Sequence, residues 1–513
     1  MTIFNGYKRI SLSDIFTIQR NNVESVTGAS SNFVNDVMKY NNLGAGSIYD
    51  KPESSATQWS LMSYLARINY SLYDRYLFSV NGRVDGSSRF GGNNKYGFFP
   101  SGSVAWRISE EGFMEPVKAV INNLKLRTSY GFTGNTEIGV YESLATLESN
   151  SWTIGNQLVS GFYPNRIPNP DLKWEKTGQF DIGFDLGLFN NRLRLTADYY
   201  YKKTTDLLYN VAIPSASGYD SMLKNIGSVQ NKGYELSIES DNLSGAFSWT
   251  TAFNISFNRN KVLELGGETY KDVGTYDDHL KTSDIRRLIV GQPIGVFYGY
   301  RFDGIFQNEA ECAQQTSSPS PIGVGLRRYK DLNGDGKIDA TNDREILGDA
   351  NPKFFGGMTN TFAYRGFELN VFLQYSYGNK IFNYNAMELE SPTGGQNVYQ
   401  DLVNRWTPTN PSNEYQKATT NRNNIVSDRF IEDGSFLKLK TVSLSYSFPK
   451  LNWKHIGGLR LYVTGQNLLT WTKYRGYDPE VSYRGASTLE AGEDFGGYPQ
   501  ARTFMFGIKL DIK

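Results

Sequence analysis

Apolar and polar residues alternate with a period of two along most of this chain, and no other feature of the sequence constrains the fold as strongly. The last ten residues, FMFGIKLDIK, place apolar side chains at every second position from Phe504 to Ile512, with Lys509 and Asp511 between them. A period of two is typical of a β-strand that has one apolar face and one polar face. The chain is therefore expected to end on an amphipathic strand.

The same alternation recurs in segments spread over the whole chain. They begin near Met62, Tyr76, Phe98, Leu124, Phe180, Leu193, Tyr234, Phe247, Ile294, Phe354, Phe367, Leu437 and Leu459. Most run for roughly 10–15 residues, which exceeds the ~5–6 residues usual in soluble sheets and suits a tilted strand that crosses a membrane. The prediction is an all-β fold, a transmembrane antiparallel β-barrel.

The connections between these segments alternate between very short and long. Tight turns are expected at Tyr73-Asp74, Asn190-Asn191 and Arg365-Gly366. The long polar loops cover residues 134–172, 209–229, 303–352, 380–435 and 473–500. Short periplasmic turns and long extracellular loops indicate an outer-membrane barrel, and the 31 phenylalanines and 34 tyrosines would supply its aromatic girdles. A soluble sandwich would also alternate, but it seldom needs strands of this length.

The direction of each strand follows from the last one, which is expected to run toward the periplasm. Counted back, the segments at 245–261 and 294–302 both point outward, so Arg286–Val290 is assigned as a downward strand between them. The count then reaches fifteen, whereas single-chain bacterial barrels have an even number of strands. Residues 57–513 are therefore predicted to be the C-terminal portion of a barrel, and residues 1–56 an extracellular loop or a partial preceding strand. The absence of a secretory signal pattern at the N-terminus agrees with that prediction.

The composition argues against several other classes of protein. Lysine and arginine number 53 and aspartate and glutamate 52, so the chain lacks the basic footprint of a nucleic-acid-binding protein. The single cysteine, Cys312, cannot form an internal disulfide framework, and His279 and His455 are too far apart in the sequence to suggest a histidine metal site. Mean hydropathy is −0.47, and no apolar run approaches the ~18–20 residues that a membrane helix needs.

Eight longer segments carry a more specific signal. They read VDGSSRFGGNNKYGFFPSGSVAWRISEE (84–111), LKLRTSYGFTGN (124–135), NPDLKWEKTGQFDIGFD (169–185), NIGSVQNKGYELSI (225–238), VGQPIGVFYGYRFDGIFQ (290–307), DLNGDGKIDATNDREILGDANPKFFGG (331–357), EDGSFLKLKTVSLSYSFP (432–449) and GQNLLTWTKYRGYDPEV (465–481). In this order they resemble the SusC/RagA family of TonB-dependent transporters. The similarity covers nearly the whole chain, from about residue 30 to its end.

The resemblance implies a barrel of 22 strands in the outer membrane of a Gram-negative cell, with an N-terminal plug inside it. The expectation for this chain is about 15 of those 22 strands, without the plug or the TonB box. The family imports oligosaccharides or peptides, is energised by the TonB complex through that box, and works with a SusD-like surface lipoprotein. The sequence does not decide between a glycan and a peptide substrate. No nucleophile elbow, phosphate loop or dinucleotide fingerprint is present, so no enzymatic activity is expected.

The segment DLNGDGKIDATND (331–343) has the spacing of a calcium-binding loop. Asp331, Asn333, Asp335 and Asp339 take positions 1, 3, 5 and 9, Gly336 takes the sharp turn at position 6, and Lys337 would offer its carbonyl at position 7. Position 12 is Asn342, so Asp343 or Glu345 would have to complete the ligand set. We predict a structural Ca²⁺ that pins an extracellular loop. The alternative is a solvated turn stabilised by Asp, Asn and Gly.

Aromatic residues in the long loops are the candidate substrate-binding residues. They are Trp152, Tyr163, Tyr399, Trp406, Tyr477 and Tyr483. Sugar rings stack on aromatic faces, so these side chains could line a binding mouth, but they could equally pack the loops or contact the lipoprotein partner.

Two functions other than energised import fit the same patterns. One is a secreted or surface-attached β-rich protein that binds Ca²⁺ and glycans as an adhesin. The other is a simple diffusion porin. An adhesin would fold without detergent, and a porin would need no TonB complex.

Overall fold

The computed structural model describes residues 2–5, 8–219, 221–274, 285–391, 397–420, 424–449, 456–485 and 487–512. The two histidines, His279 and His455, lie outside these ranges. Within them, the fold is dominated by one large sheet of fifteen strands, accompanied by six small sheets. No helix among the described residues is long and apolar enough to cross a membrane.

The strands of the large sheet follow one another mostly in chain order, in the sequence β1-β2-β5-β6-β7-β8-β11-β12-β15-β16-β23-β24-β27-β28-β30. Their bounds are β1 Thr2–Asn5, β2 Lys8–Thr27, β5 Glu53–Leu72, β6 Tyr76–Ser87, β7 Tyr96–Arg107, β8 Ile121–Asn135, β11 Glu175–Leu188, β12 Leu193–Thr205, β15 Ser228–Leu243, β16 Phe247–Glu264, β23 Phe354–Tyr364, β24 Phe367–Tyr377, β27 Phe436–Ser447, β28 Ile456–Thr472 and β30 Thr503–Ile512. The pairs β2–β5, β23–β24 and β27–β28 are antiparallel. The strands missing from this order belong to small sheets in the connections. Strands that pair antiparallel with their neighbours in chain order are connected as hairpins.

The remaining strands and the short helices lie in the connections. The loop strands are β3 Ser30–Phe33, β4 Gly46–Tyr49, β9 Thr146–Ile154, β10 Gln157–Arg166, β13 Leu208–Ala212, β14 Ser221–Asn225, β17 Tyr270–Val273, β18 Arg286–Ile289, β19 Val296–Tyr300, β20 Phe302–Ile305, β21 Arg327–Tyr329, β22 Arg344–Asp349, β25 Lys380–Asn383, β26 Ile431–Asp433 and β29 Glu493–Asp494. The α-helices are α1 Glu309–Cys312 and α2 Tyr384–Leu389. Single 3₁₀ turns span Lys39–Asn41, Leu43–Ala45, Ile108–Glu110, Gly112–Val117, Ser215–Ser217, Gln400–Asn404 and Asp428–Phe430.

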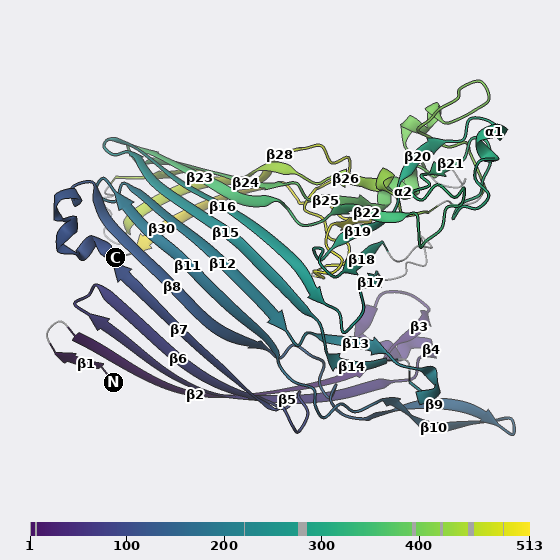
Figure 1. Ribbon diagram of the computed structural model, residues 1–513, viewed down its shortest axis with the longest axis horizontal. Helices are drawn as coiled ribbons and strands as arrows, with labels where there is room; N and C mark the ends of the chain where they lie inside the picture. The colour runs from purple at the N-terminus through teal and green to yellow at the C-terminus, as the bar shows by residue number, and fades with distance from the viewer. Residues whose placement is uncertain are drawn as a thin grey trace. The chain divides into compact units, whose positions relative to one another are not determined.

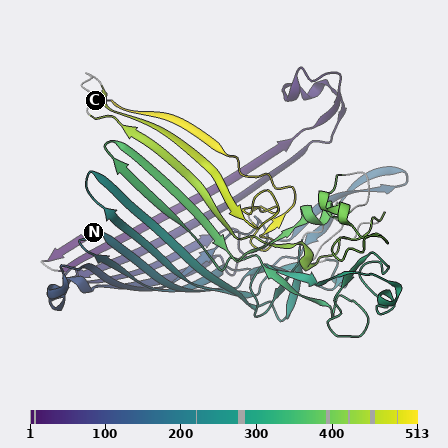
Figure 2. The same cartoon turned by 90° about the horizontal axis from the view of Figure 1, so that it is seen from above.

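The chain divides into two compact units, and each is described by itself. Unit 1 comprises Met1–Trp106, Thr128–Phe180 and Lys203–Ser228. Its strands β2 and β5 pair over their full 20 residues, from Lys8 opposite Leu72 to Thr27 opposite Glu53. This long hairpin continues into the small β3–β4 sheet (Figure 2).

The strands of unit 1 have two different faces. Tyr64 and Ile68 on β5, Val80 on β6 and Phe98 on β7 are each half or more exposed, up to 60% for Val80. Most residues of opposite parity are polar, although Leu61, Leu65 and Phe99 share their face, and Asp85 on β6 is among the buried ones. Apolar side chains therefore stand on an uncovered face, and polar groups gather on the other, as the period of two predicts.

Unit 2 comprises Arg107–Arg127, Asp181–Lys202 and Val229–Lys513. Its strands β16, β23, β24, β27, β28 and β30 run side by side (Figure 1). The long connections after β16, β24 and β28 carry small sheets, in the orders β17-β18-β19-β22, β20-β21 and β26-β25-β29. These connections share a hydrophobic core that includes Phe297, Phe382, Met387 and Phe430. The long loops of unit 2 are thus folded structure, not loose chain.

Buried ion pairs tie these loops together. The Arg286 Nε donates to Glu493 Oε1 at 3.0 Å, and both side chains are almost fully buried. The Arg429 guanidinium lies 2.8 Å from the buried Glu390 carboxylate in a mostly buried contact. Each pair joins segments that are distant in the sequence, so the loops of unit 2 hold one another in place.

The predicted number of strands, fifteen, equals the number in the large sheet, but two of the predicted strands belong to another sheet and two strands of the large sheet were not predicted. Arg286–Val290 and 294–302 are not strands of this sheet: they correspond to β18 and β19, which pair with each other in a four-stranded loop sheet. These segments are short and pack on the loop core, so they are covered by protein, not left bare on one face. β16 pairs directly with β23, so no strand is needed between them.

The other two members lie in the first 56 residues. β1 and β2 belong to the large sheet, and β2 is as long as any strand in it. Residues 1–56 therefore do not form only a loop. The long loop at 134–172 likewise contains the β9–β10 hairpin.

Candidate functional site

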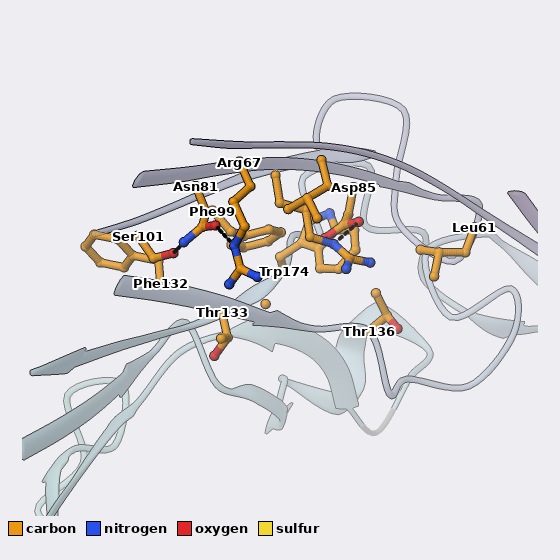
Figure 3. Close-up of a pocket in the computed structure, with 13 residues that line it drawn as sticks. Leu61, Arg67, Asn81, Asp85, Phe99, Ser101, Phe132, Thr133, Thr136 and Trp174 are labelled. Atoms are coloured by element: carbon orange, nitrogen blue, oxygen red, sulfur yellow. Dashed lines mark hydrogen bonds and ion pairs between the residues drawn. The ribbon is translucent and has the colours of Figure 1, made fainter. Parts of the chain in front are cut away.

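A pocket of about 490 Å³ lies on the polar face of unit 1 (Figure 3). Strands β5, β6, β7 and β8 and the segment before β11 supply its walls. The lining residues are Leu61, Leu65, Arg67, Asn81, Arg83, Asp85, Phe99, Ser101, Phe132, Thr133, Gly134, Thr136 and Trp174. Its volume falls within the ~300–1,000 Å³ typical of ligand sites.

A polar row crosses three strands at the floor of the pocket. Arg67 on β5 lies opposite Asn81 on β6, which lies opposite Ser101 on β7. The Arg67 Nε donates a hydrogen bond to Asn81 Oδ1, and the Asn81 Nδ2 donates to Ser101 Oγ at 3.2 Å. Figure 3 shows Arg67 extending into the pocket, between the Ser101 end and the Asp85 end. Cross-strand neighbours of this kind hold one another in fixed positions.

A second polar row holds an internally neutralised pair. The Arg83 Nε donates to both carboxylate oxygens of Asp85, at 2.7 and 2.8 Å, and an Arg83 terminal nitrogen donates to Ser63 Oγ at 3.1 Å. Arg83 and Asp85 lie two positions apart on one strand, so their side chains share a face. Asp85 is buried, and its charge is balanced by Arg83.

An apolar cluster closes the pocket on the side of the loops. Phe90, Phe99, Ile138, Leu172 and Trp174 form this cluster, and they come from the connections after β6 and β8 and before β11 as well as from β7. The Trp174 ring lies 5.4 Å from that of Phe99, and its Nε1 donates to the carbonyl of Lys95 at 3.1 Å. The pocket therefore sits where the folded loops meet the polar wall of the strands.

Gly134 is required for this packing. A Cβ at that position would approach the Phe99 ring to 2.2 Å and the Trp174 ring to 2.8 Å. Both aromatic rings are buried, so neither can move aside without cost. Gly134, in the segment LKLRTSYGFTGN (124–135), therefore allows the Phe99 and Trp174 rings to pack against β8.

The 331–343 loop has the turns that its sequence predicts. Gly334 and Gly336 have φ values of +78° and +77°. The two carboxylate oxygens of Asp331 accept hydrogen bonds from the backbone N–H groups of these glycines, at 2.6 and 2.7 Å. These bonds, chiefly the one from Gly336, hold the pKa of Asp331 below its ordinary value. Asp331 is therefore ionised at neutral pH.

Asp343 closes the loop from the other end. It is fully buried and accepts hydrogen bonds from the backbone N–H groups of Leu332 and Asp339, both at 2.8 Å. The donor types in the loop, which are carboxylates, an amide and the Lys337 carbonyl, are the hard oxygens that Ca²⁺ prefers. In the fold as described, however, the carboxylates are turned to backbone amides, and no three His, Cys, Asp or Glu side chains among the described residues gather where they could hold a metal ion.

The six aromatic candidates fall into two groups. Trp152 and Tyr163 face each other across the β9–β10 hairpin with ring centroids 6.4 Å apart, and both are substantially exposed. Tyr477 is 78% exposed.

The other three contact loop residues, although Tyr483 is as exposed as Tyr163. Tyr399 lies against the hydrophobic core of the unit 2 loops. Trp406 donates its Nε1 hydrogen to Gln307 Oε1 at 3.1 Å. Tyr483 packs edge-on against Phe495 at 5.3 Å. The six residues are therefore divided between the two units, with Trp152 and Tyr163 in unit 1 and the other four in unit 2.

Sequence reasoning did not single out the residues of the pocket. Arg67, Asn81 and Arg83 were covered only by the general statement that one strand face is polar. The signal was present in the alternation, because Arg67 on β5 and Asn81, Arg83 and Asp85 on β6 occupy alternate positions and must share the face away from the exposed apolar side chains. What the sequence could not show is which neighbour on the adjacent strands each of these side chains contacts.

Comparisons with known proteins agree with this architecture. The family model described as TonB-dependent receptor-like, β-barrel matches residues 5–468. TonB-dependent receptor P3 of Formosa agariphila is 39% identical over 514 residues, which cover 98% of this chain and 51% of that protein. TonB-dependent receptor SusC of Bacteroides thetaiotaomicron is 32% identical over 472 residues, covering 89% of this chain and 44% of SusC.

A solved structure described as the RagAB peptide transporter superimposes with a TM-score of 0.83 at 26% identity, covering 99% of this chain and 54% of that one. The chain is thus an outer-membrane β-barrel, and it belongs to the TonB-dependent receptor-like β-barrel family. Within that family it is of the SusC/RagA type, which confirms the resemblance read from its sequence. It spans about half the length of the curated relatives that it matches.

Proposed function

We propose that this chain forms the barrel part of a SusC-like importer that carries oligosaccharides or peptides across the outer membrane. A SusD-like surface lipoprotein would help to capture the substrate, and the TonB complex would supply the energy through the plug and TonB box characteristic of the family. The protein would move its substrate without making or breaking bonds. The observation that carries this proposal is the contrast between the two faces of the strands, one apolar and bare, the other polar and lining a pocket.

The similar proteins support the transport class. The RagAB structure is described as a peptide transporter, and SusC is named a TonB-dependent receptor. A polar inner face with a pocket at the loop end suits a substrate that enters from the loop side. Both substrate classes remain compatible with these features.

Uptake by cells tests the proposal. Deleting the coding sequence of this chain should abolish uptake of one class of labelled substrate, either oligosaccharides or peptides, and reintroducing it should restore uptake. Depleting TonB in the complemented cells should have the same effect as the deletion. Uptake that needs this chain but not TonB would instead indicate a diffusion porin, and uptake of both classes unchanged by the deletion would contradict import altogether.

We further propose that the exposed aromatic residues contact the substrate, with Trp152, Tyr163 and Tyr477 presenting free ring surface. Tyr399, Trp406 and Tyr483 would act by shaping the loops of unit 2, which their rings contact. Replacing Trp152 by alanine should weaken binding of an oligosaccharide, whereas the Trp406→Ala change should alter loop stability first. Equal substrate affinity of the Trp152→Ala variant and the parent would contradict the first part.

We also propose that the 331–343 loop binds a structural Ca²⁺ through Asp331, Asn333, Asp335, Lys337, Asp339 and Asp343. The ion would neutralise the carboxylates and pin the loop. Isothermal titration of the detergent-purified chain should show uptake of Ca²⁺, and the Asp335→Asn variant should bind it more weakly. An unchanged rate of proteolytic cleavage near residue 335 with and without Ca²⁺, or no uptake at millimolar Ca²⁺, would contradict the proposal.

A further inference from the structure

We propose that the apolar face of unit 1 carries a groove that holds one acyl chain of a membrane glycerophospholipid, with Gly102 as the floor of the groove. The inference rests on the outer-membrane location of the chain and not on the proposed import function. It concerns the face opposite to the polar pocket described above.

The groove has a volume of about 310 Å³ and is lined by residues of β6, β7, β8 and β11. All of its lining residues belong to unit 1. The large apolar side chains among them are Phe78, Val80, Val104, Tyr130 and Phe180, each more than a third exposed. Val80 is also part of the bare apolar face, so the groove is a hollow in the surface that an outer-membrane barrel presents to lipid.

The hollow arises at Gly102. This residue lies directly opposite Val80 in the β6–β7 pair and therefore shares its face of the sheet. Among the residues that the structure describes, a Cβ at Gly102 would meet only the carbonyl oxygen of Ser79 within 4 Å, at 3.7 Å. The space above this glycine is therefore open to a ligand.

Two other glycines on the same face are covered by aromatic rings. Gly82 and Gly86 lie on β6 at the same parity as Val80. A Cβ at Gly82 would meet the Phe98 ring at 3.5 Å, and one at Gly86 would collide with the Tyr96 ring. The rings of β7 thus fill the gaps that these glycines leave, whereas the gap at Gly102 is left for an atom group from outside the described chain.

Additional parts of a longer transporter would not cover this groove. Its four strands lie inside the large sheet, between β5 on one side and β12 on the other. Further strands could join the sheet only at its edges, β1 and β30. A plug of the kind found in the family lies inside the barrel, on the polar face. The medium that meets the groove is therefore the hydrocarbon of the membrane.

The depth of the groove indicates which leaflet supplies the chain. Tyr76 and Trp106 stack with ring centroids 6.4 Å apart where β6 begins and β7 ends, and aromatic rings at strand ends mark the membrane interface. Gly102 lies four positions before Trp106. For a strand tilted by about 40°, that spacing is about 10 Å along the membrane normal, within the nearer half of an apolar band about 25 Å tall.

A glycerophospholipid with its headgroup at the level of Tyr76 and Trp106 would therefore place an acyl chain in the groove. Lipid A in the opposite leaflet would have to reach past the middle of the membrane. A chain in the groove touches walls from several strands, whereas a chain on a flat wall touches protein on one side only, so it gains more dispersion contacts.

Photolabelling of the full chain in lipid vesicles tests this inference. The vesicles contain phosphatidylethanolamine and phosphatidylglycerol, with a small fraction of phosphatidylethanolamine that carries a diazirine in one acyl chain. After irradiation, mass spectrometry of the peptides identifies the labelled residues. Val80 and Tyr130 should be labelled several-fold more than Ile68, which pairs with Val80 at the same depth but does not line the groove.

Filling the groove should abolish this preference. Gly102→Leu should lower the labelling of Val80 and Tyr130 to the level of Ile68. Ala66→Leu is the matched control, because Ala66 is also exposed on the bare face of β5 but does not line the groove. It should leave the labelling unchanged. If Gly102→Leu does not insert into vesicles, Gly102→Ala should still give a partial loss, since its Cβ makes only an ordinary contact.

Three results would overturn the inference. Equal labelling of Val80, Tyr130 and Ile68 in the parent, or unchanged labelling in Gly102→Leu, would show that no chain is held there. Stronger labelling by diazirine-bearing lipid A would assign the groove to a different lipid. A dimeric parent that Gly102→Leu converts to a monomer would mean that a second copy of the chain fills the groove. Each of these outcomes leaves the import function intact, because uptake tests that function separately.

Discussion

Lys438 is a deeply buried lysine that contacts two carboxylates. Its Nζ lies 2.6 Å from Asp478 Oδ1 and 2.6 Å from Glu480 Oε2, and its side chain is only 2% exposed. It stands near the start of β27, whereas both carboxylates belong to the loop that follows β28. A buried lysine between two carboxylates fixes the loop to the strand, because separating them would leave unpaired charges in a region of low dielectric.

Replacing Lys438 by methionine should therefore loosen the loop at 473–502. The change keeps the apolar stem but leaves Asp478 and Glu480 without their shared cation, at a cost of about 3 kcal/mol. Hydrogen–deuterium exchange should show faster exchange in that loop. Lys440→Met serves as the control, because Lys440 contacts only Glu480, at 2.9 Å, and is more exposed. Equal effects of the two changes would contradict the role assigned to Lys438.

The same contact predicts a dependence on pH. Burial alone would raise the pKa values of Asp478 and Glu480, but hydrogen bonds from Lys438, aided by a backbone N–H at Asp478 and by Lys440 at Glu480, bring both pKa values below their ordinary range. Because these pKa values are lower in the folded state, their stabilisation is present above the ordinary values and is lost as the pH falls through the folded ones.

The loop should therefore keep its stability from neutral pH down to about pH 5 and lose it below about pH 4. The stability difference between the parent and Lys438→Met should shrink over that interval, because protonated carboxyls no longer need the lysine. Limited proteolysis of both proteins at a series of pH values would measure it. A difference that stays constant between neutral and acidic pH would show that these carboxylates do not stabilise the loop.

At the scale of elements, the alternation identifies strands well but does not say which sheet they join. Thirteen of the fifteen predicted strands lie in the large sheet, and β5 and β24 are examples with long, regular alternation. The segment of β19 was assigned to the same sheet because it alternates, and that of β18 because the strand directions required one more strand before it. They are short and covered on both faces, and burial on both faces arises from tertiary packing that no local pattern records.

The two faces of a strand should respond differently to charge. Val80 and Ser79 are neighbours on β6, with Val80 60% exposed on the apolar face and Ser79 donating to Asn69 Oδ1 at 2.8 Å on the polar face. Val80→Arg should destabilise the membrane-inserted protein by ~2–4 kcal/mol, since a charge in hydrocarbon is costly, whereas Ser79→Arg should cost less because a charge on the polar face stays hydrated. Urea unfolding in lipid vesicles compares them, and equal losses would indicate that both faces meet the same medium.

At the scale of the whole molecule, family and location followed from the sequence, whereas the pocket did not. The eight resembling segments and the alternating strands were sufficient for an outer-membrane barrel of the SusC/RagA type. Finding the pocket required knowing which side chains of β5, β6 and β7 meet on the polar face and where the loop cluster around Trp174 packs against them. Both depend on side-chain geometry between segments that are distant in the sequence. Neither the period of two nor the composition contains that information.

The bare apolar faces lead to a prediction about the folding medium. Tyr64, Ile68, Val80 and Phe98 present ring and aliphatic surface that no part of the described chain covers. In water this surface would drive association, whereas detergent or lipid tails would cover it. The chain should therefore refold from urea into detergent micelles or lipid vesicles and aggregate when diluted into buffer alone. Heat-dependent migration on an SDS gel and a β-sheet circular dichroism spectrum would report folding, and size-exclusion chromatography would report aggregation. A monodisperse, folded protein in buffer without detergent would mean that the apolar faces are covered by protein, as in a secreted adhesin, and it would remove the physical basis for a passage through the membrane.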